Sequence, residues 1–213
     1  MMISKFLINA RWIATTVVLA ALANVTALSA QAEEADKLEG INRKVFYVNE
    51  RLDHYVLRPV AVTYTKVIPD PLERGVDNFF SNLGEIGNVV NDVLQGKFKQ
   101  AGLDSSRFLI NTTIGVAGLF DVAARAGIEK SEGEDFGQTL AVWGVGEGPY
   151  LMLPLIGPST LRDAPSKFVD SLTSPLSYVD DVSARNSARA LDLLATRASL
   201  LEYDEIISGD KYL

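Results

Sequence analysis

Apolar residues recur at helical spacing from position 41 onward. Between positions 41 and 56 they fall three or four residues apart, which places them on one face of a helix. The pair Arg58-Pro59 follows directly, and proline disfavours the helical conformation of the residue before it. The sequence therefore predicts an amphipathic helix that ends near Arg58.

The same spacing predicts further helices in the first half of the chain. Apolar positions predict one helix over 72–80 and another over 86–94, with Gly84 between them and Gly96 after the second. A narrower apolar stripe that contains several small residues predicts a helix over 98–116. We therefore expect a series of helices joined by short connections rich in glycine and proline.

The segment 107–126 differs because apolar side chains surround most of its helix circumference. A helix of this kind is either buried in a core or in contact with lipid, and its small residues permit close backbone approach in both settings. Judged on this segment alone, core burial is the favoured interpretation. Its large apolar members are Phe108, Leu109, Ile110, Ile114, Val116, Leu119 and Phe120.

Two later segments complete the pattern. Residues 137–163 carry almost no charge, yet glycine and proline are concentrated within 144–158 and predict an extended or turning segment. Residues 181–202 combine one apolar face with arginine and acidic residues, which predicts a surface helix packed on the domain, with membrane-surface binding as the alternative. The fold predicted from the whole pattern is a single all-α domain, interrupted by the segment 144–158.

Composition narrows the possible functions. The chain has 213 residues, of which 47% are hydrophobic and 22% charged, as in a folded domain that leans apolar. The net charge of −7 argues against a nucleic-acid partner, because such binders neutralise phosphates with lysine and arginine. The absence of cysteine excludes disulfides, thiolate metal sites and the acylated lipobox cysteine of bacterial lipoproteins.

The first 32 residues have the organisation of a secretory signal peptide. Lys5 and Arg11 precede an apolar run, and the small residues Ala30 and Ala32 supply a cleavage site. A retained membrane anchor is the alternative. We therefore expect an exported protein whose working domain is 33–213.

Candidate catalytic chemistry is scarce. The one histidine, His54, lies on the first predicted helix, where a surface or packing role is the ordinary one. The glycine cluster 144–148 lacks the lysine of a phosphate-binding loop. A pair of carboxylates placed by the fold would be the remaining route to an enzyme. We expect no catalytic residues, no metal and no cofactor.

Three long stretches closely resemble the MlaA family, also called VacJ. They are LEGINRKVFYVNERLDHYVLRPVAVTY at 38–64, GVDNFFSNLGEIGNVVNDVLQGKFKQAGLDSSRFLINTTIGVAGLFDVA at 75–123, and EDFGQTLAVWGVGEGPYLMLPLIGPSTLRD at 134–163. The resemblance runs in order from about residue 38 to residue 203.

This resemblance implies a helical ring in the inner leaflet of the bacterial outer membrane. Its amphipathic channel would remove mislocalised phospholipids from the outer leaflet and so maintain lipid asymmetry. The implied partners are phospholipids, a trimeric outer-membrane porin and the periplasmic lipid carrier MlaC, and no reaction is catalysed. An exposed charge at bilayer depth costs at least a few kcal/mol, so a ring with an apolar rim and a wetter interior would ease headgroup passage. The alternative is a soluble periplasmic protein that binds a lipid or another hydrophobic ligand.

The resemblance also suggests which residues contact lipid or move. In this setting the favoured interpretation of the segment around 108–120 changes from core burial to contact with lipid or the channel. The segment 144–158 would be part of the ring wall, where it would either border the channel or act as a rigid connector. The lipid-contact candidates are Phe108, Leu109, Ile114, Leu119, Phe120, Tyr150, Leu151, Leu153, Leu155 and Ile156. The N-terminal motif candidates are Asn42, Arg43, Asn49, Asp53 and Arg58.

Asn49 and Asp53 are one helical turn apart on the polar side of the first helix. They would face either a wet channel or simply solvent, and solvent is the default expectation. This chain departs from the family pattern in two ways. Many relatives have Asp-Pro-Leu-Glu where this chain has Asp36-Lys37-Leu38-Glu39, and its C-terminus stops where relatives usually continue. We expect the second departure to weaken docking to the carrier.

Overall fold

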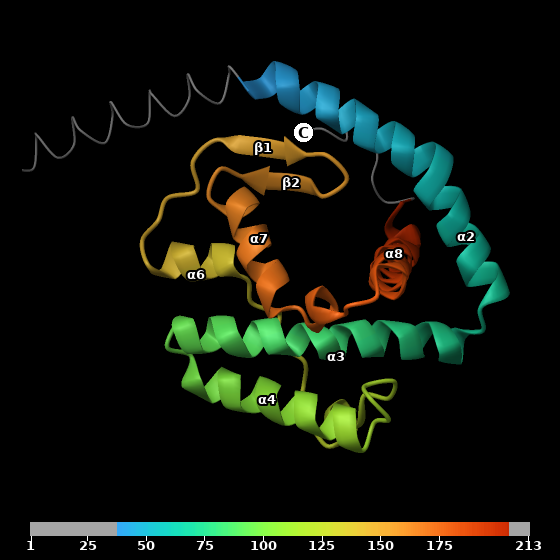
Figure 1. Ribbon diagram of the computed structural model, residues 1–213, viewed down its shortest axis with the longest axis vertical. Coiled ribbons are helices and arrows are strands. Elements are labelled where there is room, and N and C mark those ends of the chain that lie inside the picture. The colour runs from blue at the N-terminus through green and yellow to red at the C-terminus, as the bar shows by residue number, and fades with distance from the viewer. Residues whose placement is uncertain (1–37, 205–213) are drawn as a thin grey trace, which may run out of the picture.

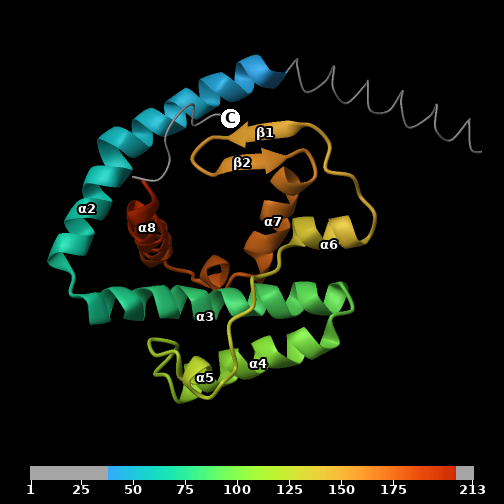
Figure 2. The same ribbon diagram turned by 180° about the vertical axis from the view of Figure 1, so that it is seen from behind.

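The computed structural model describes residues 38–204, which form one ring-like arrangement of helices. The N-terminal helical segment and α2 (Arg58–Val67) form one side of the ring, α3 (Asp70–Leu94) lies along another, and α7 (Asp163–Thr173) with a β-hairpin closes the circuit (Figure 1). α8 (Val182–Ser199) packs against α2 and α3, whereas α4 (Phe98–Thr113) lies on the outer side of α3, as the reverse view also shows (Figure 2). The signal peptide expected at 1–32 lies outside the described residues.

The first helix does not end near Arg58, so that prediction is wrong. The chain is helical over 38–52, passes through one π-helical turn, η1 (Asp53–Leu57), and continues as α2 (Arg58–Val67). In this turn the Arg58 N–H donates to the carbonyl of Asp53, five residues back. Pro59 therefore falls in the first turn of a new α-helical stretch, where its missing N–H is tolerated.

The break predicted at Gly84 is also absent. Residues 70–94 form a single helix, α3 (Asp70–Leu94), in place of two shorter ones. One glycine inside a helix costs only about 1 kcal/mol relative to alanine. Packing of α3 against α4, α6, α7 and α8 supports the helix on both sides of this position. Gly96 adopts a positive φ of 76°, which fits the helix end expected there.

α4 (Phe98–Thr113) ends earlier than the apolar pattern predicted. Residues 114–120 form a compact turn before the short helix α5 (Val122–Arg125), so the expected continuous helix over 107–126 is wrong. Gly118 has a φ of 91°, and a β-carbon there would lie 2.7 Å from the side chain of Asn82. The turn therefore depends on glycine at a site of close contact with α3.

The second half of the chain carries the only sheet within 38–204. After α6 (Phe136–Val142), β1 (Tyr150–Leu153) pairs antiparallel with β2 (Gly157–Thr160), in a register that joins Tyr150 to Thr160. The extended segment predicted at 144–158 is thus a hairpin within a predominantly helical fold. The remaining elements are α7 (Asp163–Thr173), η2 (Pro175–Tyr178), α8 (Val182–Ser199) and η3 (Leu201–Tyr203).

Burial is reversed relative to an ordinary globular domain. The buried hydrophobic residues are all small or flexible, namely Ala61, Ala101, Ala123, Met152, Ala195 and Ala198, whereas many large apolar side chains are exposed. Ile114 is 67% exposed, and Leu109 and Phe120 are also exposed, so core burial of the 108–120 segment is wrong. Extended apolar surface of this kind marks contact with a membrane or a partner protein. No helix within 38–204 is long and apolar enough to cross a bilayer.

Candidate functional site

The interface between α3 and α4 contains buried charges. Arg107 on α4 is 2% exposed and donates to Glu85 on α3, which is 1% exposed, over 3.0 Å. It also pairs with Asp121 over 2.9 Å, and this carboxylate caps α5 by accepting from the Ala124 N–H. Burial opposes ionisation of Asp121, but its hydrogen bonds to Ala124, Arg107 and Asn111 outweigh that effect and lower its pKa. One arginine therefore ties together α3, α4 and the turn before α5.

The opposite face of α3 is joined to α6 and α7 by further polar contacts. The Thr139 hydroxyl donates to the side-chain oxygen of Asn91 over 2.8 Å, and the Phe136 N–H donates to Asp170 over 2.8 Å. The Glu134 N–H donates to Asn88 over 3.0 Å. The ring is thus held by hydrogen bonds between its helices where a globular domain would use large apolar side chains.

Two asparagines attach the hairpin to the N-terminal helical segment. The Asn42 amide donates to the Tyr150 carbonyl over 2.9 Å and accepts from the Met152 N–H over 2.8 Å. The Asn49 amide repeats this arrangement two helical turns later, donating to the Leu153 carbonyl over 2.8 Å and accepting from the Leu155 N–H over 2.9 Å. The default expectation that Asn49 faces solvent is therefore wrong, because its amide is paired with the hairpin backbone.

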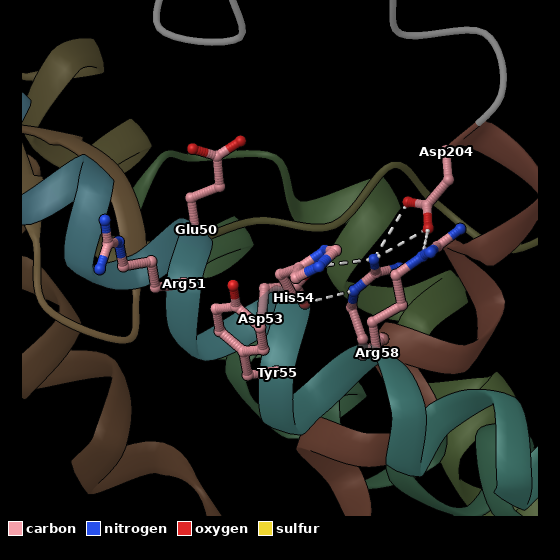
Figure 3. Close-up of a pocket in the computed structure, with 8 residues that line it drawn as sticks. Glu50, Arg51, Asp53, His54, Tyr55, Arg58 and Asp204 are labelled. Carbon is pink, nitrogen blue, oxygen red and sulfur yellow. Dashed lines mark hydrogen bonds and ion pairs between the residues drawn. The ribbon is translucent and has the colours of Figure 1, made fainter.

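A chain of ion pairs joins the first helix to the C-terminal end of α8 (Figure 3). Arg197 Nε and Nη2 donate to the two oxygens of Asp53 over 2.6 and 3.0 Å, and Nη2 also reaches Asp204 over 3.0 Å. Arg58 Nε donates to Asp204 Oδ2 over 2.8 Å, an oxygen that also accepts from Arg197 Nη2. The Asp53 hydrogen bond contributes most to raising the pKa of Arg197, so this guanidinium stays charged. The expectation of a simple solvent-facing Asp53 is wrong as well.

Two cavities have both Asp53 and Arg197 among their lining residues. The charged cavity has a volume of about 390 Å³, and its other lining residues are Glu50, Arg51, His54, Tyr55, Arg58 and Asp204 (Figure 3). The leucine cavity has a volume of about 220 Å³, and its apolar lining consists of Leu52, Leu57, Leu155, Ile156, Leu193 and Leu200. The ion pair therefore borders both a charged cavity and a mainly apolar one.

The structure brings together only some of the predicted site residues. Leu155 and Ile156, at the turn of the hairpin, meet Asn49 and Asp53 at the leucine cavity, and Arg58 lines the charged one. Tyr150, Leu151 and Leu153 lie in β1, along the asparagine contacts. The remaining candidates lie away from both cavities. Arg43 forms an exposed ion pair with Glu39. The apolar candidates of α4 and the turn after it lie on the outer side of α3, and they are Phe108, Leu109, Ile114, Leu119 and Phe120.

Sequence reasoning missed Arg197 and Asp204. Both lie near the end of a helix that was interpreted as a solvated surface element, and charged residues at its C-terminal end fitted that interpretation. The available signal was the position of Arg197 between Ala195 and Ala198, which lie on the predicted apolar face of this helix. Within the described part of the chain no three histidines or carboxylates are grouped as a metal site would require.

Comparison with known proteins decides the family. The model of the MlaA lipoprotein family matches residues 34–213. The chain belongs to the MlaA family. It is 38% identical over 188 residues to the intermembrane phospholipid transport system lipoprotein MlaA of Shigella flexneri, and equally to that of Escherichia coli strain K12. Each alignment covers 86% of this chain and 74% of the relative.

A solved structure supports the same assignment. It comes from work on the structural basis for maintenance of bacterial outer membrane lipid asymmetry, and it matches this MlaA family member with a TM-score of 0.72 and 40% identity. The match covers 82% of this chain and 90% of the other. The resemblance identified from sequence motifs is therefore confirmed, and so is the single, mainly helical domain.

Proposed function

We propose that the protein is the outer-membrane component of an intermembrane phospholipid transport system. It would remove mislocalised phospholipids from the outer leaflet through an amphipathic channel and so maintain lipid asymmetry. The observation that carries this proposal is the reversed burial: many large apolar side chains are exposed, while charged and amide side chains such as Glu85, Arg107 and Asn91 are buried. Such a ring can lie against hydrocarbon because its exposed side chains are largely apolar and these charged groups are withdrawn between helices.

Membrane attachment would come from this apolar surface. The sequence contains no cysteine to carry an acyl chain, and exposed side chains such as Phe98, Ile114 and Phe168 supply the area that a membrane or a partner would cover. A trimeric outer-membrane porin would cover part of the same surface. A periplasmic carrier of the MlaC type would receive the lipid. No catalysed step is needed for this transfer.

Fractionation and complementation test the proposal together. The full chain is expressed in an Escherichia coli strain lacking its own MlaA protein, and outer-leaflet phospholipid is labelled with an amine reagent that does not cross membranes. We expect recovery in the outer-membrane fraction with a co-purifying porin trimer, and a return of surface phospholipid toward the wild-type level. A freely soluble periplasmic protein with no effect on surface phospholipid would overturn the proposal and favour a soluble lipid-binding protein.

A further inference from the structure

The tight turn that follows α4 has the features of a segment immersed in hydrocarbon. We infer that this apolar turn, residues 114–120, inserts into the acyl-chain layer of a lipid bilayer and anchors the ring there. The turn lies at the end of α4, on the side of α3 away from the centre of the ring (Figure 1 and Figure 2). The inference rests on the membrane location in the proposed function, and it adds the element that enters the bilayer.

The residues of the apolar turn are sorted by size. Gly115 and Gly118 are buried, and a β-carbon at Gly115 would collide with the backbone around it, so the protein-facing side of the turn requires glycine. The large apolar side chains are exposed instead, and no residue of 108–120 carries a charge. Covering this outer surface with acyl chains would remove apolar area from water. The exposed apolar side chains are Ile114, Val116, Leu119 and Phe120.

The backbone of the apolar turn is paired internally. Every residue of the turn other than Val116 donates its N–H to a backbone carbonyl of 110–116. Just before the turn, the Thr113 hydroxyl donates to the Leu109 carbonyl over 2.6 Å. Water or a partner protein would supply such bonds from outside, whereas hydrocarbon supplies none, so a segment at that depth must pair its polar groups internally. This pairing selects hydrocarbon over a partner protein as the environment of the turn.

The apolar turn keeps its shape at a conformational cost. Val116 and Ala117 have positive φ angles of 55° and 58°, a left-handed region that is strained for a β-branched residue. Asparagine adopts this conformation more readily, so the local structure alone would favour a polar residue at position 116. Asn78 of α3 holds the strained turn by donating to the Leu119 carbonyl over 3.2 Å. An apolar side chain kept in a strained position is expected where that side chain itself contacts a ligand or membrane.

Two exposed arginines flank the apolar turn. Arg125 lies in α5, directly after the turn. Arg74 adjoins Gly75 on α3, where a β-carbon would lie 3.8 Å from the Leu119 side chain. Neither arginine forms an ion pair within residues 38–204. An uncharged tip with cations beside it matches the order of hydrocarbon and phosphate in a bilayer.

The nearby acidic groups are engaged with other partners. Asp121 pairs with Arg107 over 2.9 Å. Burial, followed by the charges of Asp77 and Glu73, raises the pKa of Tyr64 on α2, so these two carboxylates lie toward that helix. The two flanking arginines are therefore available to lipid phosphates, with their aliphatic stems along the apolar surface.

Single-cysteine labelling measures the depth of the turn. The chain contains no cysteine, so one introduced cysteine can carry the polarity-sensitive fluorophore NBD alone. Ile114→Cys and Val116→Cys place the label on the turn. Val182→Cys, at the start of α8 beside Asp181, is the matched control, because Val182 is 57% exposed and Val116 is 58% exposed. The labelled full chain is diluted from detergent into preformed vesicles of phosphatidylethanolamine and phosphatidylglycerol that contain no porin.

The two positions should respond to opposite quenchers. We expect lipids with a nitroxide on the acyl chain to quench the turn labels, and aqueous iodide to quench them at least about threefold less than the control label, since an inserted segment is withdrawn from water. Equal quenching by iodide at Val116→Cys and Val182→Cys would overturn the inference. So would a chain that does not bind the vesicles. Shielding of the turn that appears only after a porin trimer is added would also overturn it and assign the turn to a partner protein.

A substitution that relieves the strain separates anchoring from folding. Val116→Asn should leave the melting temperature unchanged or raise it, because asparagine suits the positive φ. It should nevertheless lower partitioning into vesicles about tenfold, as expected when a buried valine side chain is lost from hydrocarbon. Val182→Asn is the matched control and should change neither quantity. A folded Val116→Asn protein that partitions within twofold of the wild type would show that the turn is not an anchor.

The flanking arginines give an independent readout. Arg74→Gln and Arg125→Gln should each weaken binding to vesicles that contain phosphatidylglycerol by about fivefold at low salt, and should have little effect on vesicles of phosphatidylcholine alone. Val116→Asn should weaken binding to both kinds of vesicle. Arginine variants that bind phosphatidylglycerol vesicles as the wild type does would refute the contact with lipid phosphates.

The inference and the proposed function fail in different ways. If iodide reaches the turn in vesicles as readily as it reaches the control position, the inference is wrong, whatever the transport result. If the wild-type chain does not lower surface phospholipid in the complementation strain, the proposed function is wrong, whatever the depth of the turn.

Discussion

Asp92 presents the most unfavourable electrostatic environment on α3, and its replacement by asparagine should stabilise the protein. Its side chain is 0% exposed, and neither carboxylate oxygen has a hydrogen-bond donor among the described residues. Asp104 on α4 is equally buried, but it accepts from Gln100 over 2.8 Å and from Ser131 over 3.0 Å. Burial first, then the negative charges of Asp104 and Glu134, raise the pKa of Asp92 to about 6, with partial compensation from Lys97.

The size of the effect follows from this shift. A pKa raised from 3.8 to about 6 means that the folded protein holds the proton more tightly than the unfolded chain does. The stabilisation is fully present below pH 3.8 and is lost as the pH rises through 6. Each pKa unit corresponds to about 1.4 kcal/mol, so the free energy of unfolding should fall by about 3 kcal/mol between acidic and neutral pH through this group.

Asp92→Asn removes the titration and keeps the shape of the side chain. Its amide supplies a donor toward Asp104, so the variant should exceed the wild type by up to about 3 kcal/mol at pH 8, by roughly half of that at pH 5, and by little below pH 3.8. Urea unfolding in detergent, followed by circular dichroism at pH 5, 6, 7 and 8, measures the difference. Comparing the two proteins at each pH cancels contributions from other acids with raised pKa values, such as Asp170 and Asp192.

The matched control is Asp180→Asn, since Asp180 is exposed and precedes α8. This variant should follow the wild-type pH dependence. Two results would refute the reasoning: an Asp92→Asn protein that is less stable than the wild type at pH 8, or a stability difference that does not change between pH 5 and pH 8.

Three other substitutions test the ring and its hairpin. Glu85→Ala leaves Arg107 with one fewer buried partner and should cost about 3 kcal/mol by urea unfolding, and a loss below 1 kcal/mol would contradict the buried pair. Asn49→Ala removes two hydrogen bonds to the hairpin, so the Leu155 amide should exchange with solvent at least tenfold faster, whereas Asn186→Ala on α8 should not change it. Leu153→Asp should raise surface phospholipid in the complementation strain with normal amounts of protein, and absent, unfolded protein would instead indicate a rigid connector.

Local patterns predicted most helices but not where they end. Pro59 and Gly84 are both strong local signals for a break, and both lie in continuous helix. Gly84 is tolerated because four other helices pack along α3, and Pro59 because a π-helical turn precedes it. The spacing of apolar residues along the sequence reveals neither the packing of helices along α3 nor the π-helical turn before Pro59.

The candidate site was predictable only in part. The hairpin residues Leu155 and Ile156 were expected to contact lipid or neighbouring helices, because the family resemblance makes the glycine- and proline-rich segment 144–158 part of the ring wall. The partners of Asn42 and Asn49 were not predictable, because they are backbone groups more than 100 residues away in the chain. Reversed burial was equally hidden: an amphipathic stripe shows which residues share a face, but not whether that face points inward.

The π-helical turn has a consequence for which side of the first helix points inward. Asn42 and Asn49 are seven residues apart, which is nearly two complete α-helical turns, so both point the same way. The buried Ala61 is twelve residues beyond Asn49, and at about 100° per residue an uninterrupted α-helix would turn it roughly 120° away. The wider turn at Asp53–Leu57 absorbs one residue, so the effective spacing is eleven and the misalignment falls to about 20°. Deleting one residue inside that turn should therefore preserve the alignment of Asn49 with Ala61, while the same deletion in α2 before Ala61 should rotate the two apart.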